Sequence, residues 1–262
     1  MSLELLSRLP TSSAKPTPIL FVHGAWHGAW CWDEHFLPYF AGKGYASYAL
    51  SLRGHGSSPN NKSLRWTSIH DYVADVLEVA NSLPTAPILV AHSMGGYVVQ
   101  KVLEQYTAPA AVLMATVPPA GTLSAIVRAT LRHPVALTKV TLMMSMYPAV
   151  GTPQLSKDLL FSETMPDAQA NTYFQRLQDE SFRVIALEAS LLARPRPKLV
   201  KSPMLVMGAA NDRVFTQSEA HATARAYNTQ ATIFPDMAHD MMLEAGWQQV
   251  ADTIIRWLDQ TV

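Results

Sequence analysis

The 262-residue chain has only one cysteine, Cys31, and charged residues make up only 15% of it. A single cysteine excludes a disulfide framework and a zinc site built from cysteines. The 20 Lys and Arg residues are balanced by 20 Asp and Glu residues. Nucleic-acid binding requires a basic excess that this balance does not provide. We therefore expect no nucleic-acid partner.

The sequence also lacks a long apolar run of the kind that crosses a membrane. Its longest uncharged stretches either contain proline or glycine (105–127 and 140–156) or resemble a strand followed by a turn (83–100). The first 16 residues have no basic region followed by an apolar run, so they are not typical of a signal peptide. We expect a cytoplasmic protein without a membrane span, and the sequence leaves its oligomeric state open.

Short, continuous apolar runs alternate with helical patterns along the chain. Such runs are typical of strands covered on both faces, and their alternation with helices predicts an α/β fold with a mostly parallel, doubly wound sheet. The segment before residue 18 leaves room for one further strand at most. The predicted strands are residues 18–22, 46–50, 86–91, 110–117, 203–207 and 231–234, and the predicted helices between them are residues 69–83, 95–106, 217–227 and 244–258.

A long segment without a clear strand pattern separates two of these predicted strands. It contains about 85 residues and lies between the strands 110–117 and 203–207. Their periodicity predicts amphipathic helices at 124–138, 154–161 and 168–192. We predict a helical cap (residues 118–202) inserted into a core made of residues 1–117 and 203–262. Such an insertion is expected over the carboxyl ends of the strands, where folds of this kind bind ligands.

The strongest functional signal is the segment Ala-His-Ser-Met-Gly, residues 91–95. An apolar strand runs into a turn at Ser93 and then directly into a helix, which is the context of a nucleophile elbow. The small residues Ala91 and Gly95 allow the strand and the helix to approach closely, although glycine is usual at the first of these positions. A helix N-terminus also stabilises a developing anion. The pattern predicts that Ser93 is a nucleophile.

A second motif, His-Gly-Ala-Trp-His-Gly at residues 23–28, follows the first confident strand. Acyl transfer requires two N–H donors for the oxyanion of the tetrahedral intermediate. We predict that one donor is the backbone N–H of Met94, the residue after the nucleophile, and that the other comes from the Gly24–Ala25 backbone. We also predict that Trp26 lines the substrate pocket.

The two histidines of this motif, His23 and His27, are four residues apart, a spacing that binds metals when it lies on a helix. Here Gly24 and Gly28 interrupt the segment after a strand, and the glutamate of the His-Glu-x-x-His motif is missing. We therefore expect no metal site, and we expect His23 to be a buried hydrogen-bonding residue.

A nucleophilic serine requires a base and an acid, which follow it in the order acid and then histidine in this type of fold. Of the nine histidines, this order leaves His133, His221 and His239. His239 alone of these three lies between a predicted strand and the helix that follows it, so it is the predicted base. Asp212 follows the preceding strand, and we expect it to orient the imidazole. The neighbouring Asp240 is predicted to start a helix rather than to contact that ring.

These segments together resemble the α/β-hydrolase superfamily, and the doubled His-Gly loop resembles its branch of plant methylesterases and hydroxynitrile lyases. The resemblance implies the α/β-hydrolase fold. It also implies a catalytic triad of Ser93, Asp212 and His239, with Ala25 and Met94 at the oxyanion hole and no cofactor.

The implied function is hydrolysis of carboxylic esters of small to medium apolar substrates through an acyl-enzyme. One alternative is a small-molecule receptor that keeps the triad and turns over slowly. Another is a hydroxynitrile lyase or a cofactor-free peroxidase. Lyases of this branch have a lysine where this chain has Asp240, and haloalkane dehalogenases and epoxide hydrolases have an aspartate in place of Ser93. Both differences disfavour those reactions.

Overall fold

A single seven-stranded sheet forms the centre of the computed structural model, which describes residues 2–11 and 13–262. The strand order is β1-β3-β2-β4-β5-β6-β7, and β1 is antiparallel to β3 while all other neighbours are parallel. This confirms the predicted mostly parallel sheet. The strands are β1 (Leu5–Arg8), β2 (Ile19–Val22), β3 (Ser47–Leu50), β4 (Ile88–His92), β5 (Ala111–Met114), β6 (Met204–Ala209) and β7 (Ala231–Phe234).

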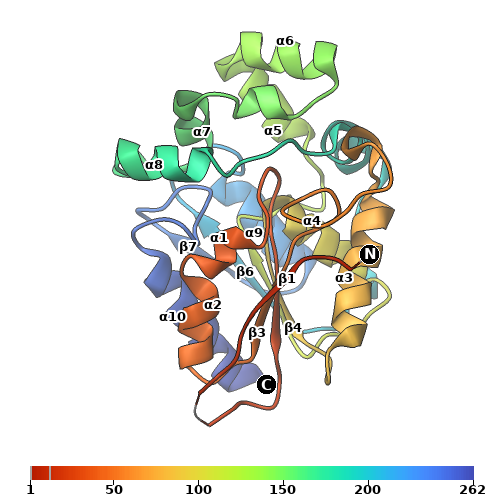
Figure 1. The fold of residues 1–262 in the computed structure, drawn as a ribbon, viewed down its shortest axis with the longest axis vertical. Coiled ribbons are helices and arrows are strands. Elements are labelled where there is room, and N and C mark those ends of the chain that lie inside the picture. The colour runs from red at the N-terminus through yellow and green to blue at the C-terminus, as the bar shows by residue number, and fades with distance from the viewer. Residues whose placement is uncertain (1, 12) are drawn as a thin grey trace.

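Helices cover both faces of this sheet. With the sheet seen edge-on in Figure 1, α2 and α10 lie on one side of it and α3 and α4 lie on the other. Strands β2 and β4 are completely buried between these layers, which explains their continuous apolar sequences. The helices around the sheet are α1 (Trp30–Asp33), α2 (Phe36–Gly42), α3 (Ile69–Ser82), α4 (Ser93–Val102), α9 (Gln217–Ala226) and α10 (Trp247–Thr261), with a short 3₁₀ turn, η1 (Leu64–Trp66).

Helix α2 was not predicted from the sequence. It is only seven residues long and contains a proline, Pro38, which argues against a helix when the pattern is read alone. The proline lies in the first turn of the helix. N–H groups in this turn have no acceptor within the helix, so the N–H group that proline lacks costs no helical hydrogen bond. Burial of Phe36, Leu37 and Phe40 against the sheet stabilises this short helix.

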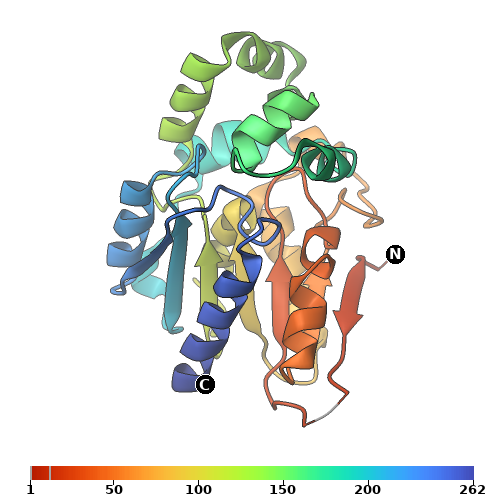
Figure 2. The same ribbon diagram turned by 90° about the vertical axis from the view of Figure 1, so that its left-hand side faces the viewer.

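The chain between β5 and β6 is mainly helical, as predicted, and its four α-helices lie beyond one end of the sheet (Figures 1 and 2). The predicted helix 124–138 is in fact two helices, because Pro134 starts a new one directly after His133. The predicted helix 168–192 is also divided, by an extended segment around residues 178–181. The elements are α5 (Leu123–Arg132), α6 (Pro134–Met143), η2 (Tyr147–Ala149), α7 (Pro153–Leu160), α8 (Asp167–Phe174), the π-helix η3 (Arg183–Leu192) and η4 (Pro197–Leu199). Across the described ranges, every helix is too short or too polar to span a membrane.

Candidate active site

Ser93 lies at the junction where β4 ends and α4 begins. Its backbone φ is +50°, in the left-handed region that a side chain other than glycine rarely adopts. A Cβ atom added at Gly95 would lie 2.2 Å from the carbonyl oxygen of His23 and 2.6 Å from that of Val22. The start of α4 therefore packs directly on the end of β2, and this close approach holds the strained turn in place.

The close approach predicts that Gly95→Ala is destabilising. The added methyl group would have to displace backbone atoms, so we expect a loss of about 1–3 kcal/mol or more in the free energy of unfolding. Gly42→Ala is the matched control, because no atom lies within 4 Å of the position of its Cβ. Thermal or urea unfolding of both variants tests this, and equal stabilities would contradict the close packing.

The structure brings together Ser93, His239 and Asp212, which the sequence places far apart. His239 Nε2 lies 2.9 Å from Ser93 Oγ, and His239 Nδ1 lies 2.9 Å from Asp212 Oδ2. The other oxygen of Asp212 accepts hydrogen bonds from the backbone N–H groups of Val214 (2.7 Å) and Phe215 (2.9 Å). The carboxylate is thus fixed in position, with one oxygen directed at the imidazole.

The surroundings of His239 favour its protonated form. Burial lowers the pKa of this imidazole, but the charge and hydrogen bond of Asp212, together with the charge of Asp240, raise it above its ordinary value of 6.5. Its neighbour His92 is different: burial, together with repulsion from His239, lowers the pKa of His92 to about 3. His92 is therefore neutral, and its Nε2 donates a 2.9 Å hydrogen bond to the carbonyl oxygen of His239.

The residues predicted for the oxyanion hole, Ala25 and Met94, line the same cavity as Ser93. Met94 is the second residue of α4, so its N–H group has no acceptor within the helix. Trp26 also lines the cavity, with a φ of +66°. Its ring Nε1 donates a 3.2 Å hydrogen bond to the carbonyl oxygen of Met146, which ties the cavity wall to residues 118–202.

The whole cavity has a volume of about 80 Å³ and is mainly apolar. Its apolar walls include Ile126, Leu137, Met146, Leu159, Ile185 and Phe215. The hydroxyl of Thr122 donates to the carbonyl oxygen of Ile185 (2.9 Å). Arg213, the one charged side chain among the described lining residues, is paired with Asp158 and Glu163. The cavity therefore suits an uncharged apolar group.

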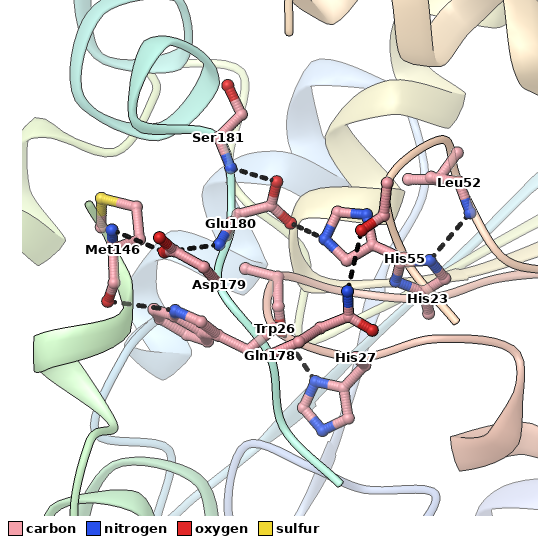
Figure 3. Close-up of polar contacts among 12 residues, drawn as sticks. His23, Trp26, His27, Leu52, His55, Met146, Gln178, Asp179, Glu180 and Ser181 are labelled. Atoms are coloured by element: carbon pink, nitrogen blue, oxygen red, sulfur yellow. Dashed lines mark hydrogen bonds and ion pairs between the residues drawn. The ribbon is translucent and has the colours of Figure 1, made fainter. Parts of the chain in front are cut away.

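The extended segment 178–181 forms hydrogen bonds and an ion pair with loops that follow strands of the sheet, and also bonds to Met146 within the helical region (Figure 3). The backbone N–H of Gln178 donates to the carbonyl oxygen of Trp26 (3.0 Å), and the Asp179 carboxylate accepts from the N–H of Met146 (2.9 Å). Glu180 forms a buried ion pair with His55 (3.2 Å). These contacts were not predicted, because none of the partners is close in sequence.

Asp240 corrects one of our predictions. It does not start a helix: α10 begins only at Trp247, and Asp240 is completely buried. Its carboxylate contacts His27 Nε2 at 3.0 Å. A tight turn explains the difference, because the Asp240 carbonyl oxygen accepts from the N–H groups of Leu243 (2.8 Å) and Glu244 (3.2 Å), which directs the side chain inward.

His23 is a buried hydrogen-bonding residue, as expected. Its Nε2 accepts a 3.0 Å hydrogen bond from the backbone N–H of Leu52, and its Nδ1 lies 2.8 Å from the carbonyl oxygen of Gly24. Both nitrogens are thus occupied by contacts with the backbone.

Within the described residues, one cluster of side chains is close enough together to hold a metal ion. It consists of His92, His239 and Asp240, whose potential ligand atoms lie within 4.8 Å of one another. Both ring nitrogens of His239 already bond Ser93 and Asp212, and Nε2 of His92 bonds the His239 carbonyl oxygen. A metal would therefore have to break these bonds, and the group is better described as a hydrogen-bonded cluster.

Comparison with known proteins supports this fold. Residues 19–253 match the sequence model of the alpha/beta hydrolase family. The chain belongs to the alpha/beta hydrolase family. Two solved structures have the same fold: a monoacylglycerol lipase from Paleococcus ferrophilus (TM-score 0.73, 19% identity, 100% of both chains covered) and a thermophilic esterase from Thermogutta terrifontis (TM-score 0.72, 21% identity, 99% of this chain and 94% of the other).

The curated relatives agree with the predicted branch. Over 90 residues the chain is 38% identical to methyl jasmonate esterase 1 from Vitis vinifera, and this aligned segment covers 33% of each protein. Over 98 residues it is 34% identical to norfluorocurarine synthase 1 from Strychnos nux-vomica, and this aligned segment covers 36% of each protein. The chain thus matches about one third of the length of these relatives.

Proposed function

We propose that this member of the alpha/beta hydrolase family is a serine esterase that uses Ser93, His239 and Asp212 as a catalytic triad. The observation that carries the proposal is the continuous chain of two 2.9 Å contacts from Asp212 through His239 to Ser93, at the wall of an apolar cavity. This is the geometry of an activated serine nucleophile. The similarity to a methyl jasmonate esterase supports a carboxylic ester as the substrate.

In the proposed reaction, Ser93 Oγ attacks the ester carbonyl carbon while His239 Nε2 takes its proton. The carbonyl oxygen becomes an oxyanion, which accepts hydrogen bonds from the N–H groups of Ala25 and Met94. The bond to the alcohol oxygen then breaks, and His239 returns the proton to that oxygen. Water then attacks the acyl carbon while His239 takes its proton; the bond between that carbon and Ser93 Oγ breaks, and His239 returns the proton to Oγ, so the acid is released and the cycle uses no cofactor.

The cavity also suggests the size and polarity of the substrate. Its volume of about 80 Å³ is small, since pockets for drug-sized ligands occupy about 300–1,000 Å³. Its apolar walls and the paired state of Arg213 disfavour a charged group. We propose that esters with a small to medium, uncharged apolar group beside the carbonyl are the preferred substrates.

Turnover of a series of p-nitrophenyl esters tests this function. We expect short and medium acyl chains to be hydrolysed at a rate of the order of 10 per second, the typical turnover of an enzyme. Binding without turnover, or turnover below about one per minute across the whole series, would contradict an esterase and favour a receptor that retains the triad.

The surroundings of His239 predict the pH dependence of this activity. The base must be neutral to accept the proton of Ser93, and the pKa of His239 is raised above 6.5, first by the charge of Asp212 acting against burial. We therefore expect kcat/KM to fall as the pH decreases, with an apparent pKa above 6.5 for the acid limb. A profile of kcat/KM between about pH 5 and pH 9 measures this limb. An acid limb below the ordinary histidine value would contradict the predicted environment.

A further inference from the structure

A second buried pair, His27 and Asp240, lies directly behind the candidate triad. His27 Nε2 contacts Asp240 Oδ2 at 3.0 Å, and the exposed fractions of the two side chains are 1% and 0%. On the other side of the ring, His27 Nδ1 donates a 2.7 Å hydrogen bond to the carbonyl oxygen of Ala25. The pair thus connects the loop that carries His239 to the loop that carries Ala25, although Asp240 and His27 are 213 residues apart in the sequence.

The hydrogen bonds determine where the protons of this pair are. The carbonyl oxygen of Ala25 can only accept, so Nδ1 of His27 must carry a proton. Burial raises the pKa of Asp240, but the charge and hydrogen bond of His27, together with His92 and His239, hold it below its ordinary value. On the other side of the ring, His27 Nε2 lies 3.0 Å from Asp240 Oδ2. Both ring nitrogens of His27 are therefore fixed by oxygen atoms, one on each of the two loops.

Packing also fixes the position of the His27 ring. Trp30 stacks on the His27 ring, with centroids 5.3 Å apart and planes inclined by 28°. The backbone N–H of Asp240 donates a 3.0 Å hydrogen bond to the carbonyl oxygen of Leu160. The second carboxylate oxygen, Oδ1, has no hydrogen-bond partner among the described residues and lies 3.7 Å from His92 Nε2. The free oxygen keeps a negative charge beside the histidine cluster.

We propose that His27 and Asp240 are positioning residues for ester hydrolysis, in which His27 fixes the oxyanion loop through the Ala25 carbonyl group and Asp240 supplies a fixed negative charge beside His239. The proposal rests on the serine esterase function proposed above. Fixing the Ala25 carbonyl also fixes the peptide that leads into the left-handed residue Trp26. Neither residue contacts the substrate cavity through its own side chain in this scheme; both act through a neighbour.

Two substitutions of His27 separate its two hydrogen bonds. The amide nitrogen of asparagine lies near the position of histidine Nδ1, so His27→Asn can still donate to the Ala25 carbonyl oxygen but loses Asp240. The longer glutamine reaches the position of Nε2, so His27→Gln retains the contact with Asp240 but loses Ala25. Since a displaced catalytic group can cost about a hundredfold in rate, we expect His27→Gln to lower kcat about tenfold to a hundredfold with little change in KM.

The matched variant is expected to rescue this loss. His27→Asn should have at least about ten times the kcat of His27→Gln, because only it keeps the Ala25 carbonyl group in place. Titration of active sites with a fluorophosphonate normalises each kcat to folded, competent enzyme, so a loss of stability in either variant does not affect the comparison. Equal kcat values for the two variants would overturn the positioning role of His27.

Asp240→Asn tests the role of the charge. Three titratable groups lie close to His239. Asp212, from the loop after β6, is bonded to its ring at 2.9 Å. His92 at the end of β4 and Asp240 from the same loop as His239 each have a ligand atom within 4.8 Å of one of its ring nitrogens. The amide group of asparagine can still form a hydrogen bond with His27, so the contact between His27 and the Ala25 carbonyl oxygen remains while the negative charge is removed. We expect the acid limb of kcat/KM to move to lower pH, since the imidazolium form of His239 loses a nearby anion.

Glu180→Gln is the control for this shift. Glu180 forms another completely buried pair with a histidine, His55, but it does not contact the triad. Both substitutions should reduce stability, and only Asp240→Asn should move the acid limb. An unmoved limb in Asp240→Asn, or an equal shift in both variants, would overturn the proposal. These outcomes require an active wild-type enzyme; a wild-type protein that neither hydrolyses esters nor reacts with the fluorophosphonate would instead refute the esterase function itself.

Discussion

Replacing Ser93 with alanine is expected to lower ester turnover by several orders of magnitude and to leave the fold intact. In a serine protease, removal of the nucleophile costs about 10⁶ in kcat. The same loss is expected here because Ser93 Oγ is the atom within 2.9 Å of the His239 nitrogen, at the edge of the apolar cavity. Alanine has a Cβ like serine, so the left-handed backbone at this position is retained.

Ser156→Ala is the matched control for this variant. Ser156 is also completely buried, and its hydroxyl has no hydrogen-bond partner in the described part of the chain. Its substitution should therefore leave turnover at the wild-type level. Initial rates with a short p-nitrophenyl ester, together with thermal unfolding of both variants, give the comparison. Wild-type turnover in Ser93→Ala would show that another group carries the covalent step.

Asp212→Asn is expected to lower turnover at least about a hundredfold, and the corresponding change costs about 10⁴ in a serine protease. The structure gives a specific reason. One oxygen of Asp212 accepts from the N–H groups of Val214 and Phe215, so the asparagine carbonyl oxygen should take that place. Its NH₂ group would then face His239 Nδ1 and donate to it. The imidazole would be held with its proton on Nε2, where it cannot accept the proton of Ser93.

The neighbouring aspartates are the comparison for this variant. Asp236 is exposed, and Asp240 bonds His27 rather than the His239 ring. Asp236→Asn and Asp240→Asn should therefore cost much less turnover than Asp212→Asn, with thermal stability measured as the control. A larger loss in Asp240→Asn than in Asp212→Asn would mean that the wrong carboxylate has been assigned to the triad.

The sequence predicted those parts of the molecule that depend on local pattern. The strand that ends at His92, the turn at Ser93 and the helix that follows are continuous in the chain, so their pattern was visible. The fixed order of serine, acid and histidine then selected Asp212 and His239. The same reasoning predicted the parallel sheet, because fully buried strands have continuous apolar sequences.

The contacts that the sequence did not reveal join residues far apart in the chain. His27 and Asp240 follow the strands β2 and β7, whose carboxyl ends point to the same end of the sheet. Nothing near either residue in the sequence indicates its partner. The same holds for His55, which lies in the loop after β3, and Glu180, which lies between α8 and η3. The position of Asp240 before a predicted helix even suggested a different role. A buried pair of this kind requires knowledge of the tertiary structure.

The most direct test of the triad is covalent labelling of the intact wild-type protein with a fluorophosphonate. The reagent reacts with an activated serine and leaves one stable adduct on its oxygen. We expect one adduct per chain by intact mass, located on Ser93 by peptide mapping, with loss of esterase activity in proportion to labelling. An unlabelled protein that still hydrolyses esters, or an adduct on another residue that accounts for the lost activity, would contradict it.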